Sequence, residues 1–208
     1  MSNSQTTTDI DDGMKATAAV NRLVFPHGVA NLTIRADASM AETYHAAFEG
    51  PKPQVSEQDG VISIDYPRFN PLIWGRTAAD ITINPARAWA FEIGGGVSRW
   101  DGDLRPVTVN SIDIRGGASE VALQLPSPAG SVPIHVSGGA SKMTLRRPDG
   151  VPARLAVGGG ASKLGLDDQF FGAVGGPVRL ESGNYSTATD RYDVEIGGGA
   201  SKITVGRE

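Results

Sequence analysis

The chain has no cysteine among its 208 residues, which excludes disulfide bonds and thiolate chemistry. It also lacks any apolar run of about 18 residues, so no membrane-spanning helix is expected. The first residues have neither the basic start nor the apolar stretch of a secretory signal. We therefore expect a cytoplasmic protein, either free or peripheral to a membrane.

Aromatic residues make up only 6% of the chain, and the net charge of −4 comes from mixed signs. No basic stripe with stacking aromatics is present, so nucleic acid is not an expected partner. The three histidines and the acidic residues show no spacing typical of zinc or calcium ligation. The triple-glycine stretches lead into alternating apolar segments, whereas a phosphate-binding loop leads into a helix. No cofactor or metal is expected.

Glycine is abundant, with 27 residues, and much of it belongs to a phrase that occurs five times. The phrase reads G-G-A-S-K-M-T-L in its clearest form, and its serines are Ser98, Ser119, Ser141, Ser162 and Ser201. The first three gaps between these serines are 21, 22 and 21 residues. A fixed period of this length is typical of a solenoid, in which each repeat rests on the previous one.

Two alternating apolar runs fill each repeat, and each predicts a strand with one buried face. The inward positions after the serines are Val121 and Leu123, Met143 and Leu145, Leu164 and Leu166, and Ile203 and Val205. The inward positions before the glycines are Phe91 and Ile93, Ile112 and Ile114, Ile134 and Val136, Leu155 and Val157, and Val194 and Ile196. The predicted fold is all-β, a single-stranded parallel β-helix with two strands per coil of about 21 residues and about six to seven coils.

The glycine turn is where the chain reverses while another coil passes above and below, so we expect positive φ angles or close backbone approach there. Stacked serine hydroxyls are expected to satisfy turn amides. A structural role is favoured over a nucleophilic one, because no histidine recurs beside the serines. The predicted turn ladder comprises Gly95, Ser98, Gly117, Ser119, Gly139, Ser141, Gly160, Ser162, Gly199 and Ser201.

Charged side chains are expected on both outer faces. After the serines, Arg99, Glu120 and Lys142 follow one another on adjacent coils and should form ion pairs. On the other strand the outward positions include Glu92, Asp113, His135 and Glu195, which we identify as a candidate surface contact. Two interpretations stay open for this second row. It is either a solvated ladder of mixed charge or a carboxylate pair of the kind that glycosidases use. The first is favoured, and no catalytic residue is assigned.

The first half of the chain repeats the same design less regularly. Residues 1–18 are expected to form a disordered tail, and residues 19–208 one β-solenoid domain. Residues 39–48 break the alternation and suggest a short helix, while residues 67–74 suggest a loop that packs Phe69 and Trp74. Residues 169–190 look like a protruding turn, and the coil around Ser201 is expected to be the last layer. That turn should shield the last strand edge, so a monomer is favoured, with a homodimer by edge pairing as the alternative.

These repeats resemble the bacterial putative-adhesin or toast-rack repeat family, which includes the C-terminal part of LiaF-type envelope-stress proteins. The resemblance covers about residues 20–207 and rests on the repeated G-G-A-S phrase, on G-V-P-A-R-L (150–155) and on the segment 190–205. It implies a β-helix without established enzyme activity that acts as a scaffold or interaction module. The resemblance also implies a protein partner, and a membrane-associated protein is one candidate for it. The alternatives are a self-assembling filament scaffold and a carbohydrate-active β-helix enzyme.

Overall fold

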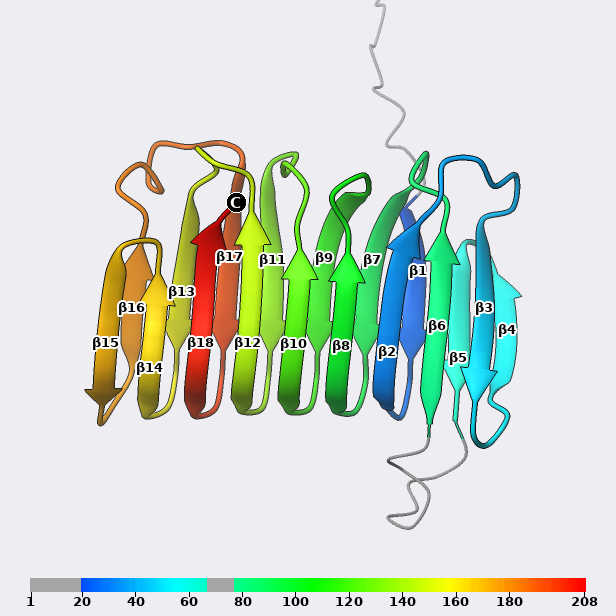
Figure 1. The fold of residues 1–208 in the computed structure, drawn as a ribbon, viewed down its shortest axis with the longest axis horizontal. Helices are drawn as coiled ribbons and strands as arrows, with labels where there is room; N and C mark the ends of the chain where they lie inside the picture. Colours follow the sequence, from blue (N-terminus) through cyan, green and yellow to red (C-terminus); the bar gives the residue numbers. More distant parts are fainter. Residues whose placement is uncertain (1–19, 67–76) are drawn as a thin grey trace, which may run out of the picture.

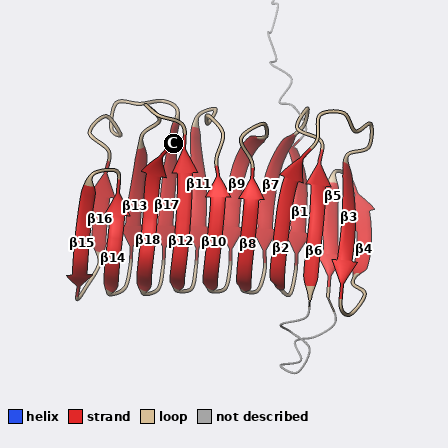
Figure 2. Ribbon diagram, in the orientation of Figure 1, coloured by secondary structure: helices blue, strands red, loops and turns tan. Residues whose placement is uncertain are grey.

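The computed structural model describes residues 20–66 and 77–208, and every regular element in these residues is a β-strand. Eighteen strands form two sheets of nine strands each, which lie face to face (Figures 1 and 2). The prediction of an all-β protein is confirmed. No helix in the described residues is long and apolar enough to cross a membrane.

We name the two sheets A and B. In spatial order, sheet A contains β16 (Val178–Glu181), β13 (Ala153–Val157), β17 (Arg191–Ile196), β11 (Ser131–Val136), β9 (Thr108–Ile114), β7 (Ala88–Ile93), β1 (Val20–Phe25), β5 (Val61–Asp65) and β4 (Gln54–Gln58). Sheet B contains β15 (Gln169–Val174), β14 (Ala161–Leu166), β18 (Ala200–Arg207), β12 (Ala140–Arg147), β10 (Ala118–Gln124), β8 (Val97–Asp103), β2 (Val29–Ala36), β6 (Ala78–Ile83) and β3 (Tyr44–Glu49). The two orders match, so the molecule is a stack of nine layers with one strand from each sheet.

The sheets are mixed rather than purely parallel. Neighbouring strands from β5 to β13 in sheet A and from β6 to β14 in sheet B run parallel. The outermost strand at each end of each sheet is antiparallel to its neighbour. The middle of the molecule therefore has the parallel coils that the repeats predict, and each end is closed by a layer that runs in the opposite sense.

The order of the coils differs from their order in the sequence. The last coil, β17 and β18, lies between β11–β12 and β13–β14 and is not the last layer. The first coil, β1 and β2, likewise lies between β5–β6 and β7–β8. Leu145 consequently pairs with Leu123 and Val205 rather than with Leu123 and Leu166. The sequence could not show this, because the two residues that compete for the place beside Leu145, Val205 and Leu166, are both aliphatic and both buried.

A continuous apolar core runs between the two sheets. All inward residues predicted from the alternation are buried, as are Leu32, Ile34, Ile81 and Ile83 of the less regular first half. Near the middle, Phe91 packs edge-on against Trp100 and parallel to Trp89. The alternation in the sequence therefore identified the buried face of these strands correctly.

Two irregular segments were predicted wrongly. Residues 44–49 form strand β3 and not a helix, because β3 pairs along its whole length with β6. Residues 169–181 are not a protruding turn but contain β15 and β16, which pair with β14 and β13. In β3 half-buried and exposed residues do alternate, but the exposed Ala47 hides the pattern in the sequence. In β15 five of the six residues are exposed, so the sequence shows no polar face opposite an apolar one. The predicted tail 1–18 and loop 67–74 lie outside the described residues.

Candidate functional site

The glycine turns stack by direct backbone contact between coils. The amide of Gly138 donates to the carbonyl of Gly116, and the amide of Gly198 donates to that of Gly138, each at 3.0 Å. A Cβ atom placed on Gly138 would lie 2.7 Å from the Gly116 oxygen. Close approach, and not positive φ, is therefore the reason for glycine here, since these turn residues do not have left-handed φ angles.

The predicted glycine column is correct at four of its five positions. Gly117, Gly139, Gly199 and Gly160 lie above one another in that order. The column continues at Gly96, because a Cβ atom on Gly96 would contact Gly117. Gly95, which the sequence analysis placed in the column, belongs to the neighbouring column and approaches Gly116 and His27 instead.

The serines follow these turns on the outer side of sheet B. Ser162 donates a hydrogen bond to Ser201 at 3.1 Å. The turn amides do not need the serines, because Val97, Ala118 and Ala140 donate to carbonyls of the adjacent coil at 3.0 Å. The expectation that the hydroxyls satisfy turn amides is therefore wrong at these three positions. Ser119 and Ser141 are the exposed serines of this row, and they face solvent beside the glycine turns.

A shallow groove of about 420 Å³ follows the serine row across the central layers. Its floor is built from small residues, so the backbone of three coils lies close to the surface. The groove is lined by His27, Gly96, Val97, Ser98, Gly117, Ala118, Ser119, Gly139 and Ser141. Along this groove the repeat brings serine hydroxyl groups and turn backbone together on one surface.

His27 was not predicted to belong with the serines. Its Nδ1 lies 2.6 Å from an Asp65 carboxylate oxygen, so the side chain is held at the end of the groove. The position could have been found from the alignment of H-G-V-A-N-L-T-I with the repeat, because His27 and Gly28 replace the first two glycines. Gly28 has φ of +88°, which only a glycine adopts readily.

The charge pairing predicted for sheet B is confirmed. Arg99 Nη2 lies 3.0 Å from Glu120 and Lys142 Nζ lies 2.7 Å from the other Glu120 oxygen. Hydrogen bonds from Lys142 and Arg99 lower the pKa of the Glu120 carboxyl below its usual value. Because these pairs are exposed to solvent, they fix the surface charge pattern more than they stabilise the fold.

The candidate row on sheet A is also assembled as predicted. Glu92 pairs in register with Asp113, Asp113 with His135, and His135 with Glu195. Arginines neutralise much of this row. Arg22 donates to Glu92 at 2.7 Å, and Arg115 lies 3.2 Å from Asp113 and 3.6 Å from Glu92. The row is a ladder in which acidic side chains lie beside arginine and histidine.

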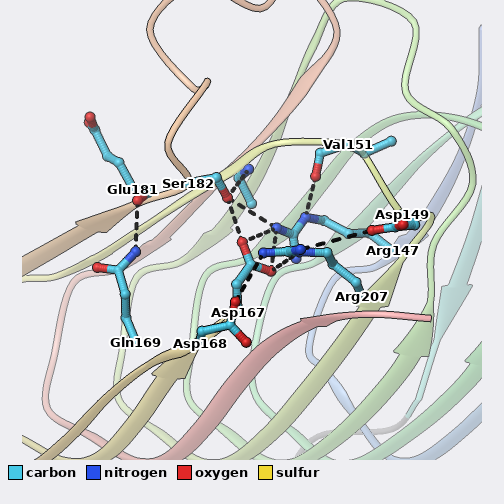
Figure 3. A network of polar contacts seen from close by, with 10 residues as sticks. Arg147, Asp149, Val151, Asp167, Asp168, Gln169, Glu181, Ser182 and Arg207 are labelled. Carbon is cyan, nitrogen blue, oxygen red and sulfur yellow. Dashed lines mark hydrogen bonds and ion pairs between the residues drawn. The ribbon is translucent and has the colours of Figure 1, made fainter.

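A buried ion pair joins Arg147, at the end of β12, to Asp167, which follows β14, and Figure 3 shows the polar network around it. Arg147 is 1% exposed and donates to both oxygens of Asp167, which is 5% exposed, at 2.7 and 2.8 Å. Ser182 and Arg207 also contact the Asp167 carboxylate, at 2.8 and 3.1 Å. Burial alone would raise the pKa of Asp167, but these hydrogen bonds outweigh it and lower the pKa. Periodicity could not predict this network, because its members come from four different strand ends.

None of these sites has the composition of a metal centre. In the described ranges, no group of three or more histidine, aspartate or glutamate side chains is placed to hold a metal ion. The groove on sheet B and the charged row on sheet A are the two candidate functional sites.

Comparison with known proteins identifies the family. The model of the toast-rack N-terminal domain, DUF2154, matches residues 1–146. A crystal structure of a putative cell adhesion protein from Clostridium sporogenes ATCC 15579 has the same fold, with a TM-score of 0.69. The two chains share 17% identity, and the alignment covers 92% of this chain and 94% of the other. No curated protein matches the sequence. Because the family model covers more than half of the sequence, the chain belongs to the toast-rack family.

Proposed function

We propose that this protein is a non-enzymatic β-solenoid scaffold that binds a protein partner through the serine groove of sheet B. The observation that carries the proposal is the groove itself, a flat strip of hydroxyls and backbone that runs across three coils. Solenoids commonly use such extended surfaces to bind other proteins. Family membership supports the same role, since the resemblance implies a scaffold in the bacterial cell-envelope stress response with a membrane-associated partner.

The geometry of the groove favours binding over catalysis. An acyl-transfer site needs free donors for the developing oxyanion. The amides of Val97, Ala118 and Ala140, which border the serines, already donate to carbonyls of the next coil. His27 and Asp65 form a hydrogen-bonded pair at one end, and this pair fixes the shape of the groove.

The carboxylates of sheet A do not favour glycoside hydrolysis either. Glu92 and Asp113 share the guanidinium of Arg115, and Glu92 is further bound by Arg22. A glycosidase needs one carboxyl free to donate a proton and the other free to attack or activate water. Here both carboxylates are engaged by arginine, so the row contributes to the charge pattern of a contact surface.

Site-specific photocrosslinking tests the binding role. A photoreactive amino acid at Ser119 is expected to capture a defined partner in a bacterial cell that naturally carries the protein, and the adduct should fractionate with membranes. Ser141→Trp would fill the groove next to Ser119 and should reduce the adduct at least tenfold. The matched control is Asn110→Trp, an exposed position on β9 of the other sheet, which should leave the adduct unchanged.

Two results would contradict the proposal. One is a Ser119 adduct that persists in the Ser141→Trp variant. The other is capture at Ser119 that is no stronger than capture by the same photoreactive residue at Asn110. Far-UV circular dichroism of both tryptophan variants should match that of the wild type, since both positions are exposed.

A further inference from the structure

We propose that two copies of the chain form a homodimer through the end of the stack that consists of β15 and β16. A two-fold axis relates the copies. On sheet B it passes between Phe171 and the Phe171 of the other copy, and on sheet A between Leu180 and the Leu180 of the other copy. This homodimer is independent of the serine groove, which lies on other layers. A second copy of the chain is the proposed partner because the side chains of this end match those of the same end in another copy.

The β15–β16 end combines free strand edges with apolar side chains. Both strands end their sheets, so each presents one edge that no described strand pairs (Figure 1). Phe170 is 74% exposed and Phe171 is 41% exposed. Phe171 pairs with the inward-facing Leu164, so it lies on the core side of β15 and is covered from one direction only. A further layer would complete its burial.

The two strands offer a common centre for a symmetric contact. Phe171 is opposite Leu164, and Leu180 is opposite Leu155. Leu164 and Leu155 belong to the same coil, on either side of its glycine turn, and are both inward-facing. Phe171 and Leu180 therefore lie at similar distances from the glycine turn, measured along the strands. For this reason a single two-fold axis perpendicular to the sheets can relate β15 to its copy and β16 to its copy.

Pairing about this axis matches side chains on both sheets. Within one chain, Arg179 Nε donates to the Glu181 carboxylate at 2.7 Å. In an antiparallel contact centred on Leu180, each Arg179 also faces the Glu181 of the other copy, so the two intrachain pairs join into one network of four charges. In a contact centred on Phe171, each Phe170 faces the Gly172 of the other copy, where no atom lies within 4 Å of the position of a Cβ. Phe170 already covers a glycine in its own chain, because its ring lies about 3 Å from the position of a Cβ on Gly165. In the dimer each Phe170 would therefore lie beside two glycines, Gly165 of its own chain and Gly172 of the other copy.

The opposite end of the stack is protected against such pairing. On β4, Glu57 pairs with the inward-facing Ile62, so a carboxylate lies at a core-side position of the edge. Burial raises the pKa of Tyr44 on β3, and the nearby charge of Glu57 raises it further. Inward charges on an edge strand are a common means of preventing association. The two ends therefore differ, and a closed dimer is expected in place of a filament.

Multi-angle light scattering tests the dimer directly. At concentrations of about 100 µM the wild-type chain should have twice the 21.7 kDa mass of one chain. Phe171→Glu should give monomers, whereas Val55→Glu, at the partly exposed core-side position of β4, should leave the dimer intact. Thermal unfolding of both variants verifies that each is folded.

Charge reversal tests the register without touching the core. Arg179→Glu places four carboxylates together in the dimer, and Glu181→Arg places four guanidinium groups together, so each variant should be monomeric. An equimolar mixture of the two variants, and the double variant R179E/E181R, should recover the dimer. A monomeric wild type would overturn the proposal. A dimer that survives Phe171→Glu or either single charge reversal would overturn it as well, since it would then use another surface.

Discussion

The buried pair of Arg147 and Asp167 gives the sharpest test of how the inserted coil is held. Asp167→Asn removes the negative charge and keeps the shape of the side chain. Asparagine is the suitable replacement because Asp167 has φ of +51°, a left-handed conformation that asparagine tolerates better than other non-glycine residues. The substitution leaves the guanidinium of Arg147 buried without its counter-charge and close to that of Arg207.

The magnitude follows from burial. Breaking a buried pair by removing one partner costs about 3–5 kcal/mol. A retained hydrogen bond to the asparagine oxygen places Asp167→Asn near 3 kcal/mol, or about 6–12 °C in melting temperature for a chain of this size. The control is Asp80→Asn in the exposed pair with Arg35, whose side chains are 53% and 61% exposed and 3.2 Å apart. That change should cost less than about 1 kcal/mol.

Urea unfolding at several pH values separates charge from packing. Because hydrogen bonds lower the pKa of Asp167 below 3.8 in the folded state, its contribution is fully present above the unfolded pKa. The contribution is lost as the pH falls through the lowered folded pKa. The stability difference between wild type and Asp167→Asn should therefore shrink below about pH 4. A difference that is constant from pH 6 to pH 2, or smaller than about 1 kcal/mol at pH 7, would refute the reasoning.

Three further outcomes test the core, the glycine turns and a buried hydroxyl by chemical denaturation. Leu145→Ala should lower the free energy of unfolding by about 2–5 kcal/mol, since it leaves a cavity between two coils. The outward Thr144→Ala should lower it by well under about 1 kcal/mol. Equal losses would mean that the strand faces are assigned wrongly. Gly138→Val should destabilise strongly, because its Cβ would lie 2.7 Å from a backbone oxygen, while Gly206→Ala, with open space around it, should behave like wild type. Tyr192→Phe should lower the free energy of unfolding by about 1 kcal/mol, because it removes the hydroxyl that donates to the buried Pro126 carbonyl at 2.9 Å. An unchanged free energy of unfolding would show that another donor replaces this hydrogen bond.

The strands and their buried faces could be predicted because they depend on local patterns. Alternation is a property of single strands, so Leu123, Ile134 and Val194 could be assigned to the core without knowing their neighbours. The pairing of Arg99, Glu120 and Lys142 was also predictable, because these coils are adjacent both in the sequence and in space.

The order of the layers could not be predicted from the same patterns. Val205 and Leu166 are similar apolar residues, and either one can pack on Leu145. What places β18 next to β12 is the route of the chain through β13–β16 and contacts such as those of Asp167. The position of His27 at the end of the groove was not predicted for a similar reason, because it also depends on which strands are neighbours. His27 reaches the serines only because β2 lies beside β8, a contact between strands far apart in the sequence.

The insertion of the terminal coils has a consequence for how such a protein can change in length during evolution. A coil appended after β18 would find no free strand edge, because β18 already pairs with β12 on one side and β14 on the other. The same holds for a coil placed before β1, which lies between β5 and β7. A duplication within the run from β7 to β12 would instead place the new coil between neighbours of its own kind. Gain or loss of repeats is therefore expected in the middle of the gene, with both closing arrangements retained.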